Sequence, residues 1–304
     1  MRQLDAKTDK ISDDLFLITL TPPIKGFSDF ICAWLYRSDI TFLVDVGPAS
    51  TAQGLLNALQ ELSVDHLDAI LLTHIHLDHA GAIGQIAARF SKTPIICHPA
   101  GIPHLVAPSR LWEGTQKVLG TKAQGYGPIQ PVPEERFEDA QQFTSEAIVP
   151  IITPGHASHH VSFWTKNYLF AGETGGVYYS IAKDRFYLRP ATPPRFFFGT
   201  HLESIDKLIA SKPKKLCYGH YGIADDAVKM LKIHRRQLLD WKTIIQAEIK
   251  RSDSTTLIEA CFQRLLKEDS LAQNFHHLPK DNQEREKFFF KNSIKGFIGY
   301  LKGE

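Results

Sequence analysis

The sequence has few cysteines, no long apolar run and almost no net charge. Its four cysteines lie far apart and form no C-x-x-C pair, so we expect no disulfide framework and a reducing, cytoplasmic compartment. No run of 18 apolar residues occurs and the N-terminus lacks an apolar signal segment, so we expect neither a membrane-spanning helix nor secretion. The 35 basic and 33 acidic residues give a formal charge of +2. That balance argues against a nucleic-acid partner.

Three common catalytic motifs are also missing from the sequence. There is no G-x-x-x-x-G-K-[ST], no G-x-G-x-x-G and no G-x-S-x-G. The usual sequence signals of a phosphate-binding loop, a dinucleotide-binding fold and a nucleophile-elbow hydrolase are therefore absent. Histidine, in contrast, is abundant: the chain has 14, against 4 cysteines and 2 methionines.

The pattern of apolar residues changes along the chain. Residues 1–224 alternate strand-like and helix-like segments, whereas residues 225–304 show only helical spacing. We therefore predict an α/β domain over 1–224 and a helical extension or lid over 225–304. The expected strands are 15–20, 30–36, 41–46, 67–72, 94–97, 147–152, 161–164, 168–171 and 216–218. The expected helices are 50–63, 82–90, 225–250, 254–266 (capped by Ser254) and 281–302. We also expect an inserted loop with short helices over 99–135 and an irregular aromatic segment over 174–200.

The most informative stretch is H-x-H-x-D-H at residues 74–79, between an expected strand and an expected helix. Imidazole nitrogens and carboxylate oxygens are good zinc ligands. The spacing of His74 and His76 places both rings on one side of an extended segment. Asp78 and His79 follow where the chain turns into the helix, so one segment offers ligands in two directions, which suits two metal ions. The alternative is a surface turn whose imidazoles are merely solvated.

Further metal-competent side chains follow later strands, each beside a glycine that lets the chain turn tightly. These are His156 after strand 147–152, Glu173 after strand 168–171 and His220 after strand 216–218. Each is a weak signal alone. Together with the H-x-H-x-D-H segment they favour a metal centre over coincidence.

At these residues the sequence resembles the metallo-β-lactamase superfamily of hydrolases, over residues 13 to about 222. The resemblance implies an αββα sandwich of two mixed sheets with helices outside. It also implies two groups of metal ligands: His74, His76 and His156 for the first metal, and Asp78, His79 and His220 for the second. Glu173 stands where the family usually places an aspartate that bridges both metals. Because glutamate is one methylene longer, three outcomes stay open: it bridges, it binds one metal, or it binds neither.

The resemblance further implies a mechanism. Two divalent metals, expected to be Zn²⁺ with Fe and Mn as alternatives, would share a bridging hydroxide that attacks the substrate. Asp78 could take or return a proton. Asp45, in the matching strand-end segment Val44-Asp45-Val46-Gly47, would accept an N–H from a ligand histidine, with a turn-capping aspartate as the alternative. His160 is a further catalytic candidate, with a hydrogen-bonded structural histidine as the alternative.

The leading hypothesis is a binuclear metallo-hydrolase that cleaves a small ester, thioester or lactone. A phosphodiesterase and a mononuclear-iron sulfur dioxygenase of the same fold are alternatives. A metal-containing binding or regulatory protein with little turnover is an alternative of another class. We expect a small-molecule substrate and no nucleic-acid or membrane partner, and both a monomer and a homodimer stay open. The aromatic segment 174–200 lines the substrate pocket in one interpretation and packs against the C-terminal helices in the other.

Overall fold

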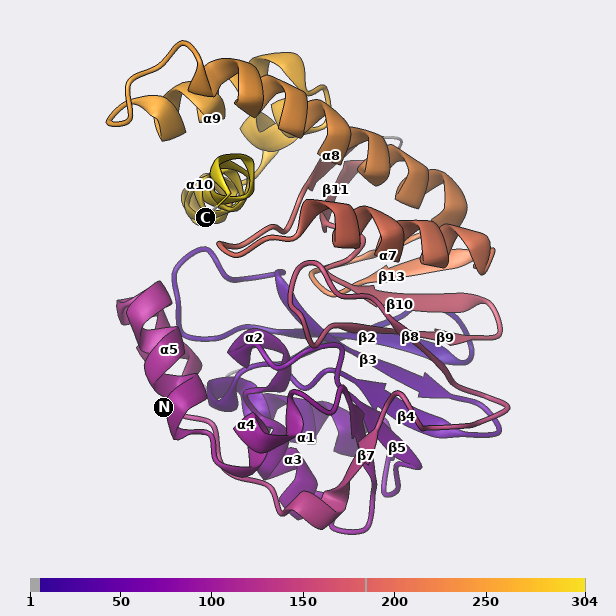
Figure 1. The fold of residues 1–304 in the computed structure, drawn as a ribbon. Coiled ribbons are helices and arrows are strands. Elements are labelled where there is room, and N and C mark those ends of the chain that lie inside the picture. Colours follow the sequence, from indigo (N-terminus) through magenta and orange to yellow (C-terminus); the bar gives the residue numbers. More distant parts are fainter. Residues whose placement is uncertain (1–5, 184, 304) are drawn as a thin grey trace. The chain divides into compact units, whose positions relative to one another are not determined.

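A computed structural model describes residues 6–183 and 185–303 (Figure 1). The chain divides into two compact units. Unit 1 contains the residues up to Ile152, the segment Val161–Lys166 and the segment Gly219–Tyr221. Unit 2 contains Thr153–His160, Asn167–Tyr218 and the residues from Gly222 onwards. The predicted boundary between the domain 1–224 and the helical extension 225–304 stays a prediction.

Unit 1 is built on a seven-stranded mixed sheet in the order β1-β2-β3-β4-β5-β6-β7. The strands are β1 (Lys7–Lys10), β2 (Leu15–Leu20), β3 (Ile31–Arg37), β4 (Thr41–Val44), β5 (Ala69–Leu71), β6 (Ile95–Cys97) and β7 (Phe137–Asp139). Pairing is antiparallel from β1 to β4 and parallel from β4 to β7. Every residue of β2 and β5 is buried, as the nearly continuous apolar runs of these strands require.

Short helices connect these strands. They are η1 (Ala49–Thr51), α1 (Ala52–Glu61), α2 (Leu77–Ala80), α3 (Ile83–Arg89), α4 (Ile102–Val106), α5 (Ser109–Leu119), α6 (Thr121–Tyr126) and the 3₁₀ turn η2 (Glu134–Arg136). Helix α1 buries Leu55, Ala58 and Leu59, which recur at helical spacing. Unit 1 also holds a hairpin of β8 (Val149–Ile152) and β9 (Val161–Thr165).

The parallel pairing of β4 with β5 places Asp45 beside the segment that carries the candidate metal ligands His74 to His79. Because both strands end at the same edge, Asp45 after β4 lies beside the segment that leaves β5, and its N–H donates to Leu71 O at 2.9 Å. Asp45 has φ +57°, a left-handed conformation that costs energy for a residue with a side chain. The next two residues, Val46 and Gly47, both donate backbone N–H groups to His79 O. Backbone hydrogen bonds alone thus hold the turn after β4 against the segment that follows β5.

Unit 2 combines short strands with the C-terminal helices. Its strands are β10 (Tyr168–Gly172), β11 (Val177–Ala182), β12 (Arg185–Arg189), β13 (Lys215–Tyr218) and β14 (Ile223–Ala224). Its helices are α7 (Phe198–Ala210), α8 (Ala227–Ile249), α9 (Leu257–Glu268), η3 (Ala272–His277) and α10 (Lys280–Lys302). None of the described helices is long and apolar enough to cross a membrane.

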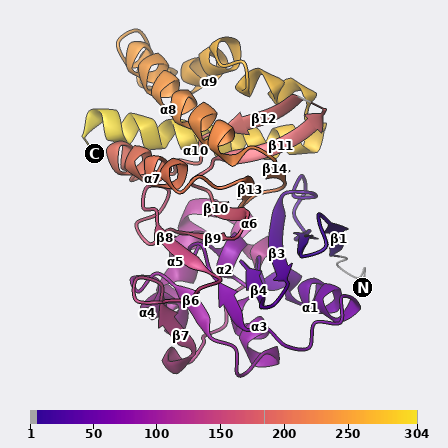
Figure 2. The same ribbon diagram turned by 90° about the vertical axis from the view of Figure 1, so that its right-hand side faces the viewer.

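The C-terminal helices share a core with the strands of unit 2. Helix α10, seen nearly end-on in Figure 1 and lengthwise in Figure 2, packs against α8. Trp241 of α8 stacks on Phe290 of α10 with ring centroids 4.5 Å apart. Phe196, from the aromatic segment, packs against Phe297 of α10 at 5.3 Å. Phe196 therefore packs against the C-terminal helices, as the second interpretation of the aromatic segment 174–200 expects.

The expected strands and long helices are present, but several details differ from the sequence-based expectations. The segment 174–200, expected to be irregular, contains the hairpin β11–β12, and helix α7 starts within it. The alternation of polar and aromatic residues there is too weak to predict strands. The pairing of β11 with β12 also shifts register between Ser180 and Ala182. Three short strands, β1, β7 and β14, were not expected either. Ser254 does not cap α9, which begins at Leu257 after the N-cap residue Thr256.

Candidate metal centre

Asp78, His79 and His220 form a compact cluster inside unit 1. His79 Nε2 lies 3.3 Å from His220 Nε2, and His220 Nε2 lies 3.7 Å from Asp78 Oδ2. One nitrogen or oxygen from each residue lies within 4.8 Å of the others. Two imidazole nitrogens and a carboxylate oxygen that converge in this way are a donor set suited to a divalent metal ion.

Asp45 determines which nitrogen of His79 faces this cluster. Asp45 Oδ2 lies 2.8 Å from His79 Nδ1, and both side chains are buried. A carboxylate can only accept, so His79 Nδ1 carries the proton and Nε2 presents its lone pair to Asp78 and His220. This is the usual arrangement behind a metal-binding histidine.

His74 and His76 lie in the same unit, on the segment between β5 and α2. His74 Nε2 is 3.1 Å from His76 Nδ1, so the two rings present nitrogens to one point. Thr73 orients the first of them: its hydroxyl lies 3.0 Å from His74 Nδ1 and donates to Asp45 Oδ2 at 2.8 Å. Because the hydroxyl hydrogen goes to Asp45, the hydroxyl oxygen accepts from His74 Nδ1. Asp45 thus orients His79 directly and His74 through Thr73.

His220 is held by residues of β3 and the turn before it. Its ring stacks on Phe30 at a centroid distance of 4.1 Å, and its backbone pairs with Ile31. The Cys32 thiol donates to Gly219 O at 3.6 Å. Burial raises the pKa of Cys32 to about 12, so the thiol stays protonated and serves as a donor rather than as a ligand.

His156 and Glu173 form a second cluster, inside unit 2. His156 Nε2 lies 2.7 Å from Glu173 Oε2, and both residues are buried. His156 Nδ1 donates to Ala191 O at 2.9 Å, which leaves Nε2 with a lone pair when the ring is neutral. A lone pair and a carboxylate oxygen at this separation need a proton or a metal cation between them. The pair therefore fits the role of metal ligands.

His160 lies behind Glu173. Glu173 N–H donates to His160 Nε2 at 3.2 Å, so the neutral ring carries its proton on Nδ1, which lies 2.9 Å from Thr153 Oγ1. The Thr174 hydroxyl is close to the same nitrogen, at 3.2 Å. These contacts give His160 a structural task, fixing the turns that carry His156 and Glu173. A direct catalytic part for His160 stays a prediction.

Sequence reasoning missed the residues that orient the candidate ligands. Thr73, Thr153 and Thr174 contact ligand or supporting histidines, yet isolated threonines at strand ends carry no distinctive spacing. His201, which the sequence analysis did not single out, is fully buried in unit 2. Nothing local distinguishes it from the exposed His104, because its burial depends on how α7 packs.

The sequence matches the family described as the Metallo-beta-lactamase superfamily over residues 30–220. A metallo-beta-lactamase fold-containing protein of Sulfurisphaera tokodaii is 28% identical over 215 residues, which cover 67% of this chain and 77% of that protein. A hydroxyacylglutathione hydrolase of Stenotrophomonas maltophilia is 27% identical over 227 residues, 74% of each chain. Another, from Serratia proteamaculans, is 31% identical over 141 residues, 46% of this chain and 45% of that protein.

Solved structures are similar in fold. An archaeal metallo-beta-lactamase superfamily protein from Sulfolobus tokodaii superposes with a TM-score of 0.71 at 20% identity, covering 94% of this chain and 99% of that chain. A metallo-beta-lactamase family protein from Thermus thermophilus gives a TM-score of 0.57 at 20% identity, with coverages of 97% and 95%. The family match and these likenesses confirm the predicted fold class, an αββα sandwich of two mixed sheets with additional C-terminal helices.

Proposed function

Because the chain belongs to the metallo-beta-lactamase superfamily and is a metallo-hydrolase, we propose that it uses two divalent metal ions to hydrolyse a small thioester, ester or lactone. The observation that carries this proposal is the cluster of Asp78, His79 and His220, in which Asp45 directs the lone pair of His79 towards its neighbours. A solvated histidine does not need a fixed tautomer, whereas a metal ligand must direct its lone pair at the metal ion.

We assign two ligand groups. Asp78, His79 and His220 hold one metal ion, and His74, His76 and His156 hold the other. Glu173 contributes a carboxylate oxygen beside His156 Nε2. Imidazole-rich sets with carboxylates favour Zn²⁺, and iron or manganese would fit the same donors. When bound, the metal ions supply a nucleophilic hydroxide near neutral pH and polarise the scissile carbonyl.

The protein's own side chains have three tasks in this proposal. Asp45 and Thr73 fix the tautomers of His79 and His74, so that the ligand nitrogens need no reorganisation. Asp78, whose side chain is partly exposed, moves a proton between water and the leaving group. Phe30 and Cys32 hold the His220 ring and the turn before it.

The thioester is the preferred substrate class. The supporting observation is that two relatives carry the name hydroxyacylglutathione hydrolase, and a hydroxyacylglutathione is a thioester. The near-neutral net charge of +2 fits a small substrate better than a nucleic acid. We further propose that the protein acts in the cytoplasm and needs no macromolecular partner.

A panel of substrates tests this proposal. Purified protein with two equivalents of zinc is assayed on a thioester, an ester, a lactone and a phosphodiester. We expect hydrolysis of a carbonyl substrate, fastest for the thioester, and loss of that hydrolysis with a chelator. Turnover of the phosphodiester alone would favour the phosphodiesterase alternative. No turnover of any substrate with both metals bound would favour a binding protein.

Replacing Asp45 by asparagine should weaken metal binding at the Asp78, His79 and His220 cluster by about 10–100-fold. Asparagine tolerates the left-handed backbone at this position, so the change removes the charge and one acceptor without adding strain. Competition for Zn²⁺ with a chromophoric chelator measures the affinity. Asp39→Asn, on an exposed carboxylate, is the control and should leave the affinity unchanged. An Asp45→Asn protein with the affinity of the wild type would contradict the role given to Asp45.

A further inference from the structure

Two buried histidines of unit 2 have ring nitrogens that find no hydrogen-bond partner among the residues that the structure describes. His201 of α7 and His234 of α8 are fully buried, with ring centroids 6.2 Å apart and ring planes at 89°. Neither ring nitrogen of His201 has a hydrogen-bond partner within the described part of the chain, and the same holds for Nε2 of His234. Buried polar atoms are nearly always satisfied, by protein or by an ordered water molecule.

The tautomer of His234 follows from its neighbours. Gln237 Nε2 donates to Leu188 O at 2.7 Å and to Asp269 Oδ2 at 2.8 Å, which fixes this nitrogen as the amide donor. The amide oxygen therefore faces His234 Nδ1, at 3.3 Å, and that nitrogen carries the proton. Burial lowers the pKa of His234 to about 4, so the ring is neutral at pH 7. Its Nε2 is accordingly an acceptor that needs a donor.

Both rings lie against the turns that carry the proposed metal ligands of unit 2. His201 Nδ1 is 2.3 Å from where a Cβ on Gly155 would lie, so the imidazole touches the backbone directly before His156. Ser204, also on α7, donates to Pro154 O at 2.7 Å. Helix α7 thus supports the Pro154-Gly155-His156 turn with one packed ring and one hydrogen bond.

His234 supports the other turn in the same way. Its Cε1 is 2.8 Å from where a Cβ on Gly176 would lie, and Gly176 has φ +82°. Gly176 N–H donates to Glu173 O at 3.0 Å and so closes the turn that begins at Glu173. Any side chain at position 176 would displace the His234 ring.

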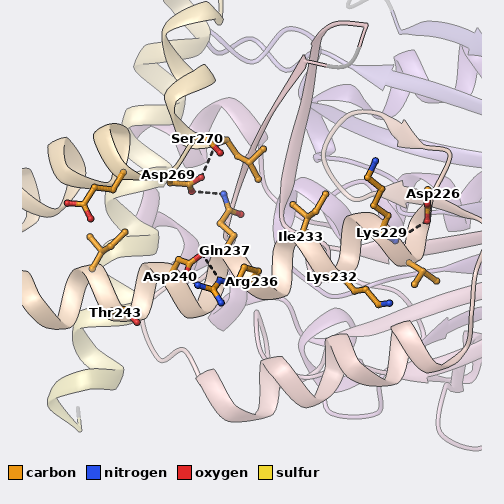
Figure 3. A pocket seen from close by; sticks show the side chains of 14 residues that line it. Asp226, Lys229, Lys232, Ile233, Arg236, Gln237, Asp240, Thr243, Asp269 and Ser270 are labelled. Atoms are coloured by element: carbon orange, nitrogen blue, oxygen red, sulfur yellow. Dashed lines mark hydrogen bonds and ion pairs between the residues drawn. The ribbon is translucent and has the colours of Figure 1, made fainter.

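We propose that His201 and His234 are joined through a buried water molecule and act as positioning residues for the turns that carry His156 and Glu173. His234 Nε2 accepts from the water, and His201 bonds to the same water with one ring nitrogen. The chain of hydrogen bonds then runs from Asp269 through Gln237 and His234 to His201. Figure 3 shows the outer end of this chain, where Asp269 meets Gln237 beside a surface hollow along α8. In this proposal α8 supports one of the turns of unit 2 that carry candidate metal ligands.

A double-mutant cycle tests the proposed pair. His201→Phe and His234→Phe keep a ring and remove its nitrogens, and each should weaken Zn²⁺ binding at least 10-fold in chelator competition. Because both act through one water, the double variant should be little worse than either single variant. His201→Gln, which restores a donor and an acceptor, should recover part of the affinity, whereas a site that needs only packing would favour phenylalanine. Additive losses, or unchanged zinc affinity in the phenylalanine variants, would overturn the proposal.

Two further measurements keep the test decisive. His277→Gln, on an exposed histidine of unit 2, is the control and should bind zinc as the wild type does. Nitrogen-15 NMR of the metal-free wild type should report His234 protonated on Nδ1 and not on Nε2, and the opposite tautomer would refute the pair even if the variants fail to fold. The assignment of ligands rests on the proposed function. A wild type that binds no zinc would refute that function, while the opposite tautomer of His234 would refute the pair whether or not zinc binds.

Discussion

A His79→Ala protein is expected to lose one equivalent of bound metal and well over 100-fold of its hydrolytic rate. The loss should exceed the roughly 10–100-fold typical of residues that only support a ligand, because His79 itself supplies the converging Nε2. Alanine also leaves the buried Asp45 carboxylate without its imidazole partner, which adds a cost to stability. Metal content by elemental analysis and kcat/KM on the best thioester measure the two effects.

The control for this experiment is His66→Ala. His66 lies in the same unit and pairs with Asp68, but its side chain is 72% exposed. We expect normal metal content and normal rates in that variant. A His79→Ala protein that retained both metal ions and full activity would refute the role of the Asp78, His79 and His220 cluster.

Replacing Glu286 by glutamine should destabilise the fold by about 3–5 kcal/mol. Glu286 of α10 accepts from Arg189 Nε at 2.5 Å and from Arg285 Nε at 3.1 Å, and all three side chains are buried. Glutamine keeps the size but not the charge, so two buried guanidinium groups lose their counter-ion. Urea denaturation measures the loss of unfolding free energy. Glu268→Gln, at a half-exposed pair with Arg264, is the control and should cost about 1 kcal/mol or less.

The same carboxylate gives a pH dependence of stability. Burial alone would raise the pKa of Glu286, but Arg189 and Arg285 outweigh it and lower the pKa from 4.5 to about 2. The pKa is thus lower in the folded state, so the resulting stability is fully present above pH 4.5 and is lost as the pH falls towards 2. The difference between the unfolded-state pKa of 4.5 and the folded-state pKa of about 2 corresponds to roughly 3 kcal/mol of unfolding free energy. Unfolding free energies of the wild type should decline across this range more steeply than those of Glu286→Gln, and parallel profiles would contradict the assignment.

The sequence indicated the candidate ligand segments because they combine rare spacing with simple topology. The H-x-H-x-D-H segment follows β5, and the parallel pairing of β4 with β5 brings Asp45 to the same edge. The position of His220 after a strand made it a candidate ligand, but only the resemblance grouped it with Asp78 and His79, because 141 residues separate it from His79. Its backbone pairing with Ile31 depends on the completed fold.

The supporting residues could not be predicted, for a physical reason. Thr73, His201 and His234 act through contacts that arise from the packing of whole elements, and no local periodicity encodes those contacts. The C-terminal helices show the same limit. Their helical spacing was evident, but the ion pair between Arg189 of β12 and Glu286 of α10 joins residues 97 positions apart.

Anomalous diffraction at the zinc edge, from crystals of the zinc-loaded protein, tests the central claim most directly. We predict a zinc peak bound by His79 Nε2, His220 Nε2 and an Asp78 oxygen, at about 2.0–2.2 Å from each. We also predict that Asp45 remains bonded to His79 Nδ1. Zinc-loaded crystals without a peak at these three residues, or with His79 rotated away from Asp45, would contradict the account.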